Sequence, residues 1–119
     1  MAINYKLTRA EARLAEIIWA RGEIASPELV RIAAEALGWK RTTTYTILKK
    51  LCDKGVARND AGMVSALTRE EFFAGQSRRF VEDTFGGSLP LFLASFIGGG
   101  KLTPEQAAEL KRLIERHEE

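Results

Sequence analysis

One stretch of the sequence, residues 39–55 (WKRTTTYTILKKLCDKG), constrains the fold more than any other. On a helix that advances about 100° per residue, Thr44, Leu48 and Leu51 fall on one line, with Ile47 beside them. This i, i+4, i+7 pattern is typical of a helix face that packs on a hydrophobic core. We therefore expect a helix here that buries one face and leaves the opposite face exposed.

The opposite face of that helix is basic, rich in hydroxyl groups and nearly free of acidic side chains. Lys and Arg neutralise phosphates, and Thr and Tyr hydroxyls donate to phosphate oxygens or base edges. The side chains that we predict to contact DNA are Lys40, Arg41, Thr42, Thr43, Tyr45, Thr46, Lys49 and Lys50. Taken alone, such a face also suits an ordinary solvated helix, so the choice between a DNA-binding helix and a solvated helix depends on the flanking sequence.

A first helix is expected after Thr8, because Thr8 and Glu11 have the spacing of a capping box, in which each side chain satisfies an unpaired amide. Gly22 is expected to end this helix. We interpret residues 23–25 as a short connector.

A second helix is expected from Ser26 to Gly38. Ser26 suits the N-cap position, and Pro27 suits the first helical position, where its missing N–H costs nothing. Gly38 is expected to end the helix. This helix and the basic helix, joined by a tight turn, make a helix-turn-helix arrangement.

A small β-hairpin is expected next, because residues 56–59 and 63–67 flank the turn-forming residues 60–62. Arg58 is the main positive charge near its tip, so we include Arg58 among the DNA contacts and expect that contact to be weak. Three helices followed by a hairpin make a winged helix-turn-helix domain, which we assign to residues 1–68. The fold class is mainly α.

Residues 69–119 are expected to be helical. Thr68 and Glu71 form a second capping box before a helix with an aromatic side, and residues 89–97 are apolar all round. A last amphipathic helix is expected to begin at Thr103 and Pro104.

This C-terminal region has many apolar side chains but only roughly 50 residues, which seldom bury such a surface alone. A second copy of the chain would cover it, and we predict a homodimer. The alternative is that these helices fold back on the winged helix of the same chain. The predicted dimerisation residues are Phe72, Phe80, Phe85, Leu89, Leu91, Phe92, Leu93, Phe96, Leu110, Leu113 and Ile114.

The charge distribution agrees with this division. The net charge of the chain is only +2, but residues 1–70 carry 12 basic and 8 acidic side chains, whereas residues 71–119 carry 6 and 8. The positive charge therefore lies in the part with the candidate DNA helix.

Membrane insertion and secretion are not expected. No segment reaches the roughly 18 to 20 apolar residues that a membrane span needs, and the first residues lack the pattern of a secretory signal. We expect a cytoplasmic protein without a membrane partner.

Enzymatic and metal chemistry are also not expected. One cysteine, Cys52, and one histidine, His117, give no cluster with metal-ligand spacing, and no Gly-rich phosphate loop follows a strand. We predict no metal site, no cofactor and no catalytic residue. Cys52 is either a half-buried filler of the core or a redox sensor on the basic helix.

Five segments carry a family resemblance that spans nearly the whole chain. They are LTRAEARLAEIIWARGEI, TTTYTILKKLCDKGV, LTREEF, FGGSLPLFLASF and KLTPEQAAELKRLIE. In order and spacing they resemble the penicillinase-repressor family of winged-helix transcriptional regulators, the BlaI/MecI/CopY group. The resemblance implies a dimeric repressor that reads an inverted-repeat operator in double-stranded DNA and whose C-terminal helices intertwine with those of the second subunit.

The resemblance also implies DNA contacts from the first turns of the basic helix, and among them we expect Thr43 and Thr46 to touch bases. The core position between these two is often valine in the family and is Thr44 here, which leaves a hydroxyl to satisfy. The hairpin departs further, because residues 63–66 (MVSA) replace aromatic and basic residues. Wing-mediated affinity is therefore expected to be low.

Two family routes of derepression find little support in the sequence. Copper-responsive members end in paired cysteines, which this chain lacks. Members that a cognate protease inactivates are cut at an Asn-Phe bond, and the nearest equivalent here is Ser95-Phe96, inside the apolar run.

A protein-binding adaptor is the main alternative function, because the winged-helix fold also serves that purpose and the wing is poor in charge.

Overall fold

The computed structural model describes residues 2–118 and divides into two compact units, with the boundary between Arg79 and Phe80. Each unit is described by itself.

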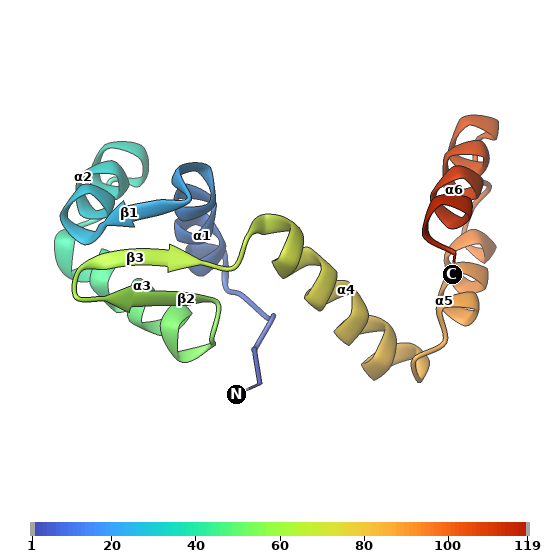
Figure 1. Cartoon of the computed structure of the whole chain (residues 1–119), viewed down its shortest axis with the longest axis horizontal. Helices are drawn as coiled ribbons and strands as arrows, with labels where there is room; N and C mark the ends of the chain where they lie inside the picture. The colour runs from blue at the N-terminus through green and yellow to red at the C-terminus, as the bar shows by residue number, and fades with distance from the viewer. Residues whose placement is uncertain (1, 119) are drawn as a thin grey trace. The chain divides into compact units, whose positions relative to one another are not determined.

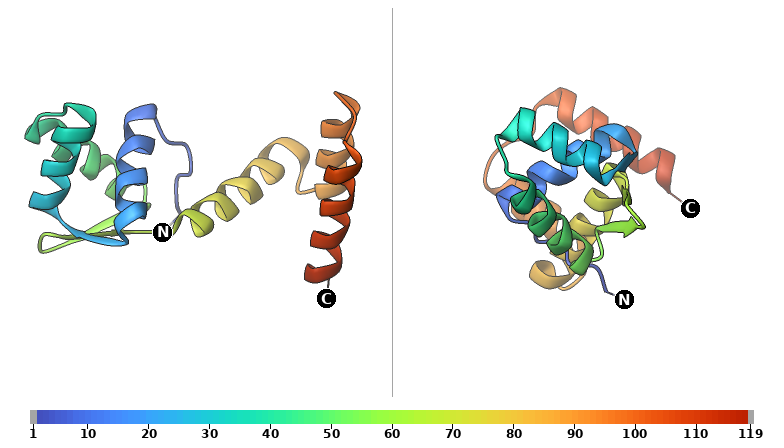
Figure 2. Two further views of the ribbon diagram at one scale, coloured as in Figure 1. Left: turned by 90° about the horizontal axis from the view of Figure 1, so that it is seen from above. Right: turned by 90° about the vertical axis from the view of Figure 1, so that its left-hand side faces the viewer.

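The first unit is a winged helix of three helices and a three-stranded antiparallel sheet in the order β1-β3-β2. Figure 1 shows the strands side by side, and in the left panel of Figure 2 the helices lie on one face of the sheet. The mainly α winged-helix prediction is confirmed. The elements are α1 (Arg9–Arg21), β1 (Glu23–Ala25), α2 (Ser26–Leu37), α3 (Arg41–Asp53), β2 (Ala57–Asp60) and β3 (Met63–Ala66).

The core of this unit lies between the helices and the sheet. Leu14 and Ile18 of α1, Leu29 of α2 and Leu51 of α3 are fully buried, together with Val64 of β3. The i, i+4, i+7 line of the basic helix is part of this core, so the expected orientation of α3 is confirmed.

Residues 23–25 are a strand rather than the connector that we expected. β1 pairs with β3, with Ile24 opposite Val64, and both side chains are buried. Three residues carry too little local signal to predict a strand, because their conformation is fixed by pairing with a segment about forty residues later.

Ser26 also differs from the prediction, since the residue at the N-cap position of α2 is Ala25 and no side chain caps this end. The Ser26 N–H donates to the carbonyl of Gly62 at 2.7 Å, and its hydroxyl accepts from the Tyr45 hydroxyl at 3.4 Å. Contacts with the wing and with α3 thus replace the local cap.

The wing turns through two residues, Ala61 and Gly62, whose φ angles are 51° and 91°. Positive φ at both positions matches the right-handed twist of a tight hairpin and favours glycine. Asn59 Oδ1 accepts from the Gly62 N–H at 3.0 Å, which fixes the turn.

Helix α4 (Arg69–Phe85) starts at the expected capping box and crosses the unit boundary. Phe72 is only 2% exposed, and its ring lies 5.4 Å from that of Trp19 and 5.5 Å from that of Tyr5. The prediction that Phe72 is a dimerisation residue is corrected, because the ring belongs to the core of the winged helix. For the same reason the unit boundary falls inside α4 and not before residue 69.

The second unit contains the end of α4, α5 (Leu89–Gly98) and α6 (Pro104–His117). Ser88 caps α5, and Thr103 and Gln106 form the capping box of α6. The rings of Phe80, Phe85 and Phe92 lie 5.4 to 6.1 Å apart. None of the described residues of this unit is fully buried.

Between residues 2 and 118, no helix is long and apolar enough to cross a membrane. The same residues contain no group of three or more His, Cys, Asp or Glu side chains that could hold a metal ion.

Candidate nucleic-acid interface

Helix α3 separates its buried and exposed side chains as the sequence pattern predicted. Thr44, Leu48 and Leu51 are buried. The Thr44 hydroxyl, which needs a partner at this buried position, donates to the Lys40 carbonyl on the preceding turn at 3.3 Å. The exposed members of the predicted DNA-contacting set are Lys40, Arg41, Thr42, Thr43, Thr46, Lys49 and Lys50, and Arg58 is exposed on β2.

The start of α3 leaves its backbone amides available. Among the described residues, 2–118, no side-chain hydrogen bond caps this end, and the first turn of the helix contains no acidic residue. The first N–H groups of a helix carry partial positive charge and have no partner within the helix. With Lys40, Arg41 and two threonines around them, these amides form a surface that suits a phosphate group.

Tyr45 differs from the other predicted contacts because it is half-buried and packs against the core. The guanidinium of Arg41 lies over its ring, 5.6 Å from the centroid. Tyr45 therefore supports the position of Arg41 and joins α3 to Ser26 at the start of α2.

Two of the predicted phosphate contacts already face acidic side chains. Lys49 Nζ lies 3.1 Å from Asp53 Oδ2, one helical turn further along α3. Arg58 Nη1 lies 3.9 Å from Asp60 Oδ2 on the same strand. These exposed pairs are weak in solvent, but each places a negative charge where a phosphate would approach. The i, i+4 spacing of the Lys49–Asp53 pair is visible in the sequence and was missed.

A hollow of about 310 Å³ lies beside α3 toward the wing, lined by Tyr45, Leu48, Lys49, Cys52 and Asn59. Its polar side chains are already engaged, since Lys49 pairs with Asp53 and Asn59 accepts from Gly62.

Cys52 is half-buried in this hollow. Burial, helped by the nearby charge of Asp53, raises the pKa of the Cys52 thiol. A raised pKa lowers the thiolate fraction that reacts with oxidants. The filler interpretation is therefore favoured over a redox sensor.

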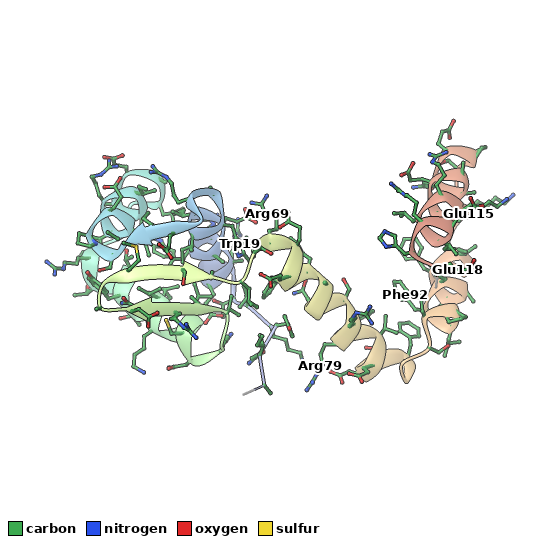
Figure 3. All side chains as sticks on the ribbon, in the orientation of Figure 1. Trp19, Arg69, Arg79, Phe92, Glu115 and Glu118 are labelled. Carbon is green, nitrogen blue, oxygen red and sulfur yellow. The ribbon has the colours of Figure 1, made fainter. Side chains whose placement is uncertain are left out.

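The start of α4 closes the core next to α1, where Figure 3 shows Trp19 and Arg69 beside one another. The Trp19 indole donates to the Leu67 carbonyl at 2.7 Å, and the Arg69 guanidinium lies 5.7 Å from the Trp19 ring. Arg69 also pairs with Glu16 of α1. Trp19 therefore packs against the core and joins α1 to the start of α4.

Comparison with known proteins identifies the family. The family model described as penicillinase repressor matches residues 7–116, which span the described helices and strands of both units up to the last residue but one of α6. The chain belongs to the penicillinase-repressor family. A penicillinase repressor from Bacillus licheniformis is 23% identical over 117 residues, which cover 94% of this chain and 91% of that protein.

Membership in the penicillinase-repressor family confirms the resemblance drawn from the sequence. It also confirms the prediction that the chain is a transcriptional regulator and not an enzyme. The individual DNA contacts and the dimerisation residues remain predictions.

Proposed function

We propose that this protein represses transcription by binding an inverted-repeat operator as a homodimer, with α3 in the major groove. The observation that carries the proposal is the division of α3 into a buried apolar face and an exposed face of cations and hydroxyls. A helix of this kind fits the width of the major groove. We assign Thr43 and Thr46 to base contacts, and Lys50 and the cations near the start of α3 to phosphate contacts.

Exposed apolar surface in the second unit supports the homodimer. Seven large apolar side chains in this unit are more than 40% exposed, and two such side chains occur in the first unit. Apolar surface of this extent marks an interaction site, and a second copy of the chain would bury it. The seven are Phe80, Leu89, Leu91, Phe96, Ile97, Leu113 and Ile114.

The proposed dimer surface also includes predicted residues that are only half-exposed, namely Phe85, Phe92, Leu93 and Leu110. The Ser95-Phe96 bond lies within α5, and the Phe96 side chain is 64% exposed. A cognate inactivating protease stays an open alternative, and the Ser95-Phe96 sequence does not support it, because it departs from the family's Asn-Phe motif.

The salt dependence of binding tests the DNA proposal. Lys50→Ala should weaken binding to all sequences about equally and reduce the slope of log K against log salt by about one, because one phosphate contact is lost. Fluorescence anisotropy with labelled duplex DNA at several salt concentrations measures this slope. Lys111→Ala on α6 removes an exposed lysine from the second unit and should leave the slope unchanged. Equal slopes for the wild type and Lys50→Ala would contradict the assignment.

A protein-binding adaptor is the second candidate, and the charge-poor wing favours it. Arg58 is offset by Asp60, and Met63 is 43% exposed beside the turn. An adaptor would show little affinity for DNA at any salt concentration, so the same titration separates the two functions.

A further inference from the structure

The segment before α1 links two helices of the first unit. In this leading segment, residues 3–7, the side chains alternate between half-buried and exposed. Ile3, Tyr5 and Leu7 pack against the core, while Asn4 and Lys6 face solvent. The alternation is that of an extended chain lying on an apolar surface.

One edge of the leading segment is bonded to the end of α3. The Asn4 N–H donates to the Lys54 carbonyl at 2.9 Å. The Lys54 ammonium donates to the Lys6 carbonyl at 2.6 Å and to Glu11 Oε1 at 2.5 Å. The segment is thus attached to the residue that follows α3.

The other edge of the leading segment is bonded to α4. Gln76 Nε2 donates to the Tyr5 carbonyl at 3.1 Å, and the Tyr5 ring packs on Phe72. A Cβ added at Gly75 would overlap Cζ and Oη of the Tyr5 ring. Glycine weakens a helix interior, so its presence here needs a packing reason, and the Tyr5 ring supplies one.

We propose that the contact between Tyr5 and Gly75 fixes the direction in which α4 leaves the winged helix and thereby determines which spacing between operator half-sites the protein accepts. This inference rests on the proposed dimeric DNA-binding function. In a two-fold dimer that is joined beyond the first turns of α4, the distance between the two α3 helices depends on the direction of α4. Rigid attachment restricts that distance, whereas a loose attachment lets both subunits engage at several spacings.

Gly75→Ala and Tyr5→Ala break the contact in different ways. Alanine at position 75 displaces the Tyr5 ring while it strengthens α4 as a helix, so melting of α4 cannot explain its effect. Ser77→Ala is the control, because it introduces alanine at an exposed position of the same helix, where it removes only a hydroxyl that donates to the Phe73 carbonyl at 2.7 Å. Far-UV circular dichroism checks that each variant remains folded.

The attachment is measured without DNA. Spin labels are attached to cysteines introduced at Lys50 on α3 and Arg78 on α4, in a Cys52→Ser background. Pulsed electron paramagnetic resonance then reports the distance between the two helices. The labelled chain is diluted into unlabelled protein so that only distances within one chain are read. We expect a narrow distribution in the wild type and Ser77→Ala, and one at least twice as wide in Gly75→Ala and Tyr5→Ala.

The preference for half-site spacing is measured with two duplexes. Both carry the half-site enriched by the wild type as an inverted repeat, and the spacing of the second differs from the selected spacing by about half a helical turn, roughly five base pairs. The affinity of the wild type should fall on the order of tenfold for the wrong spacing, because only one subunit can engage. For Gly75→Ala and Tyr5→Ala, the affinity for the wrong spacing should fall by less than about threefold, and the preference for the half-site sequence should be unchanged.

Three results would contradict the proposal. Distance distributions of equal width in all four proteins would show that the contact does not hold α4. Broadened distributions with an unchanged spacing preference would show that the contact does not determine specificity. If the wild type enriches no inverted repeat, the proposed function itself fails, and the distance measurement still decides whether the contact holds α4.

Discussion

At the residue scale, the cations on and near α3 differ in whether an acidic side chain faces them. Lys49 faces Asp53 and Arg58 faces Asp60, whereas none of the contacts described for residues 2–118 gives Lys50 an acidic partner. Two lysines on the same helix, Lys49 and Lys50, therefore differ in how readily they can bind a phosphate. Counting basic residues in the sequence does not reveal this difference, because it depends on which acid each cation faces.

Asp60→Asn tests this balance on the wing. Removal of the carboxylate frees Arg58 and also removes the repulsion between Asp60 and an approaching DNA phosphate. Two unit charges roughly 4 Å apart in water repel by about 1 kcal/mol, so DNA affinity should rise about fivefold. Fluorescence anisotropy at fixed salt measures the change. Glu105→Gln on α6 removes an acid from the second unit and should leave affinity unaltered. Unchanged or weaker binding by Asp60→Asn would show that the wing does not approach DNA.

At the element scale, Glu11 joins α1 to the end of α3. It is 2% exposed and accepts hydrogen bonds from the Thr8 N–H at 2.8 Å and from Lys54 at 2.5 Å. Burial by itself would raise the pKa of the Glu11 carboxyl, but the bonds from Lys54 and Thr8 outweigh burial and hold the pKa below its ordinary value of 4.5. The ionised carboxylate is therefore the form that the fold stabilises.

The lowered pKa of Glu11 makes the stability of the winged helix depend on pH. Its contribution is present above about pH 4.5, the ordinary value, and is lost as the pH falls through the lowered value in the folded state. Glu11→Gln should cost about 1.5 to 3 kcal/mol at neutral pH, because a charged hydrogen bond is lost, and should flatten the acid side of the stability profile. Urea unfolding between pH 3 and 7 measures both effects, with exposed Glu23→Gln as the control. A profile of Glu11→Gln parallel to that of the wild type would contradict this role.

Helix starts and buried helix faces were the features best predicted from the sequence. The capping boxes at Thr8 and Thr68, the helix start at Thr103 and the buried face of α3 all depend on residues close together in the chain. Strand β1 was missed because its pairing partner is distant in sequence.

Packing partners were predicted less well than elements. Periodicity identified the aromatic side of α4 but did not show that Phe72 packs on Trp19 rather than on a second subunit. Gly75 gave no signal, because its role depends on Tyr5, which is seventy positions earlier. The candidate DNA face was predictable because one helix supplies nearly all of it.

At the scale of the whole molecule, the two units differ in how they bury apolar surface. Among residues 2–118, all fully buried side chains belong to the first unit, and most of the large exposed apolar side chains belong to the second. The first unit has a closed core of its own, whereas the second leaves large apolar side chains exposed. We therefore propose that the first unit binds DNA and the second unit forms the dimer.

Ile114→Glu tests that separation. Ile114 is 55% exposed, and a glutamate at a buried dimer interface would lose its hydration without a partner, so dimer affinity should fall at least about tenfold. Sedimentation equilibrium at several protein concentrations measures the dimer dissociation constant. Lys111→Glu places the same side chain elsewhere on α6 and should dimerise normally. If Ile114→Glu also dimerises normally, the partner surface lies elsewhere.

The most direct test of a dimeric, sequence-specific repressor is selection of genomic fragments by the purified full chain at near-physiological salt, followed by sequencing of the retained DNA. We expect an enriched inverted repeat whose half-sites lie about one helical turn apart, because two α3 helices related by a two-fold axis read the same sequence on opposite strands. Retained DNA with no enrichment over the input would contradict the proposed function and favour the protein-binding adaptor.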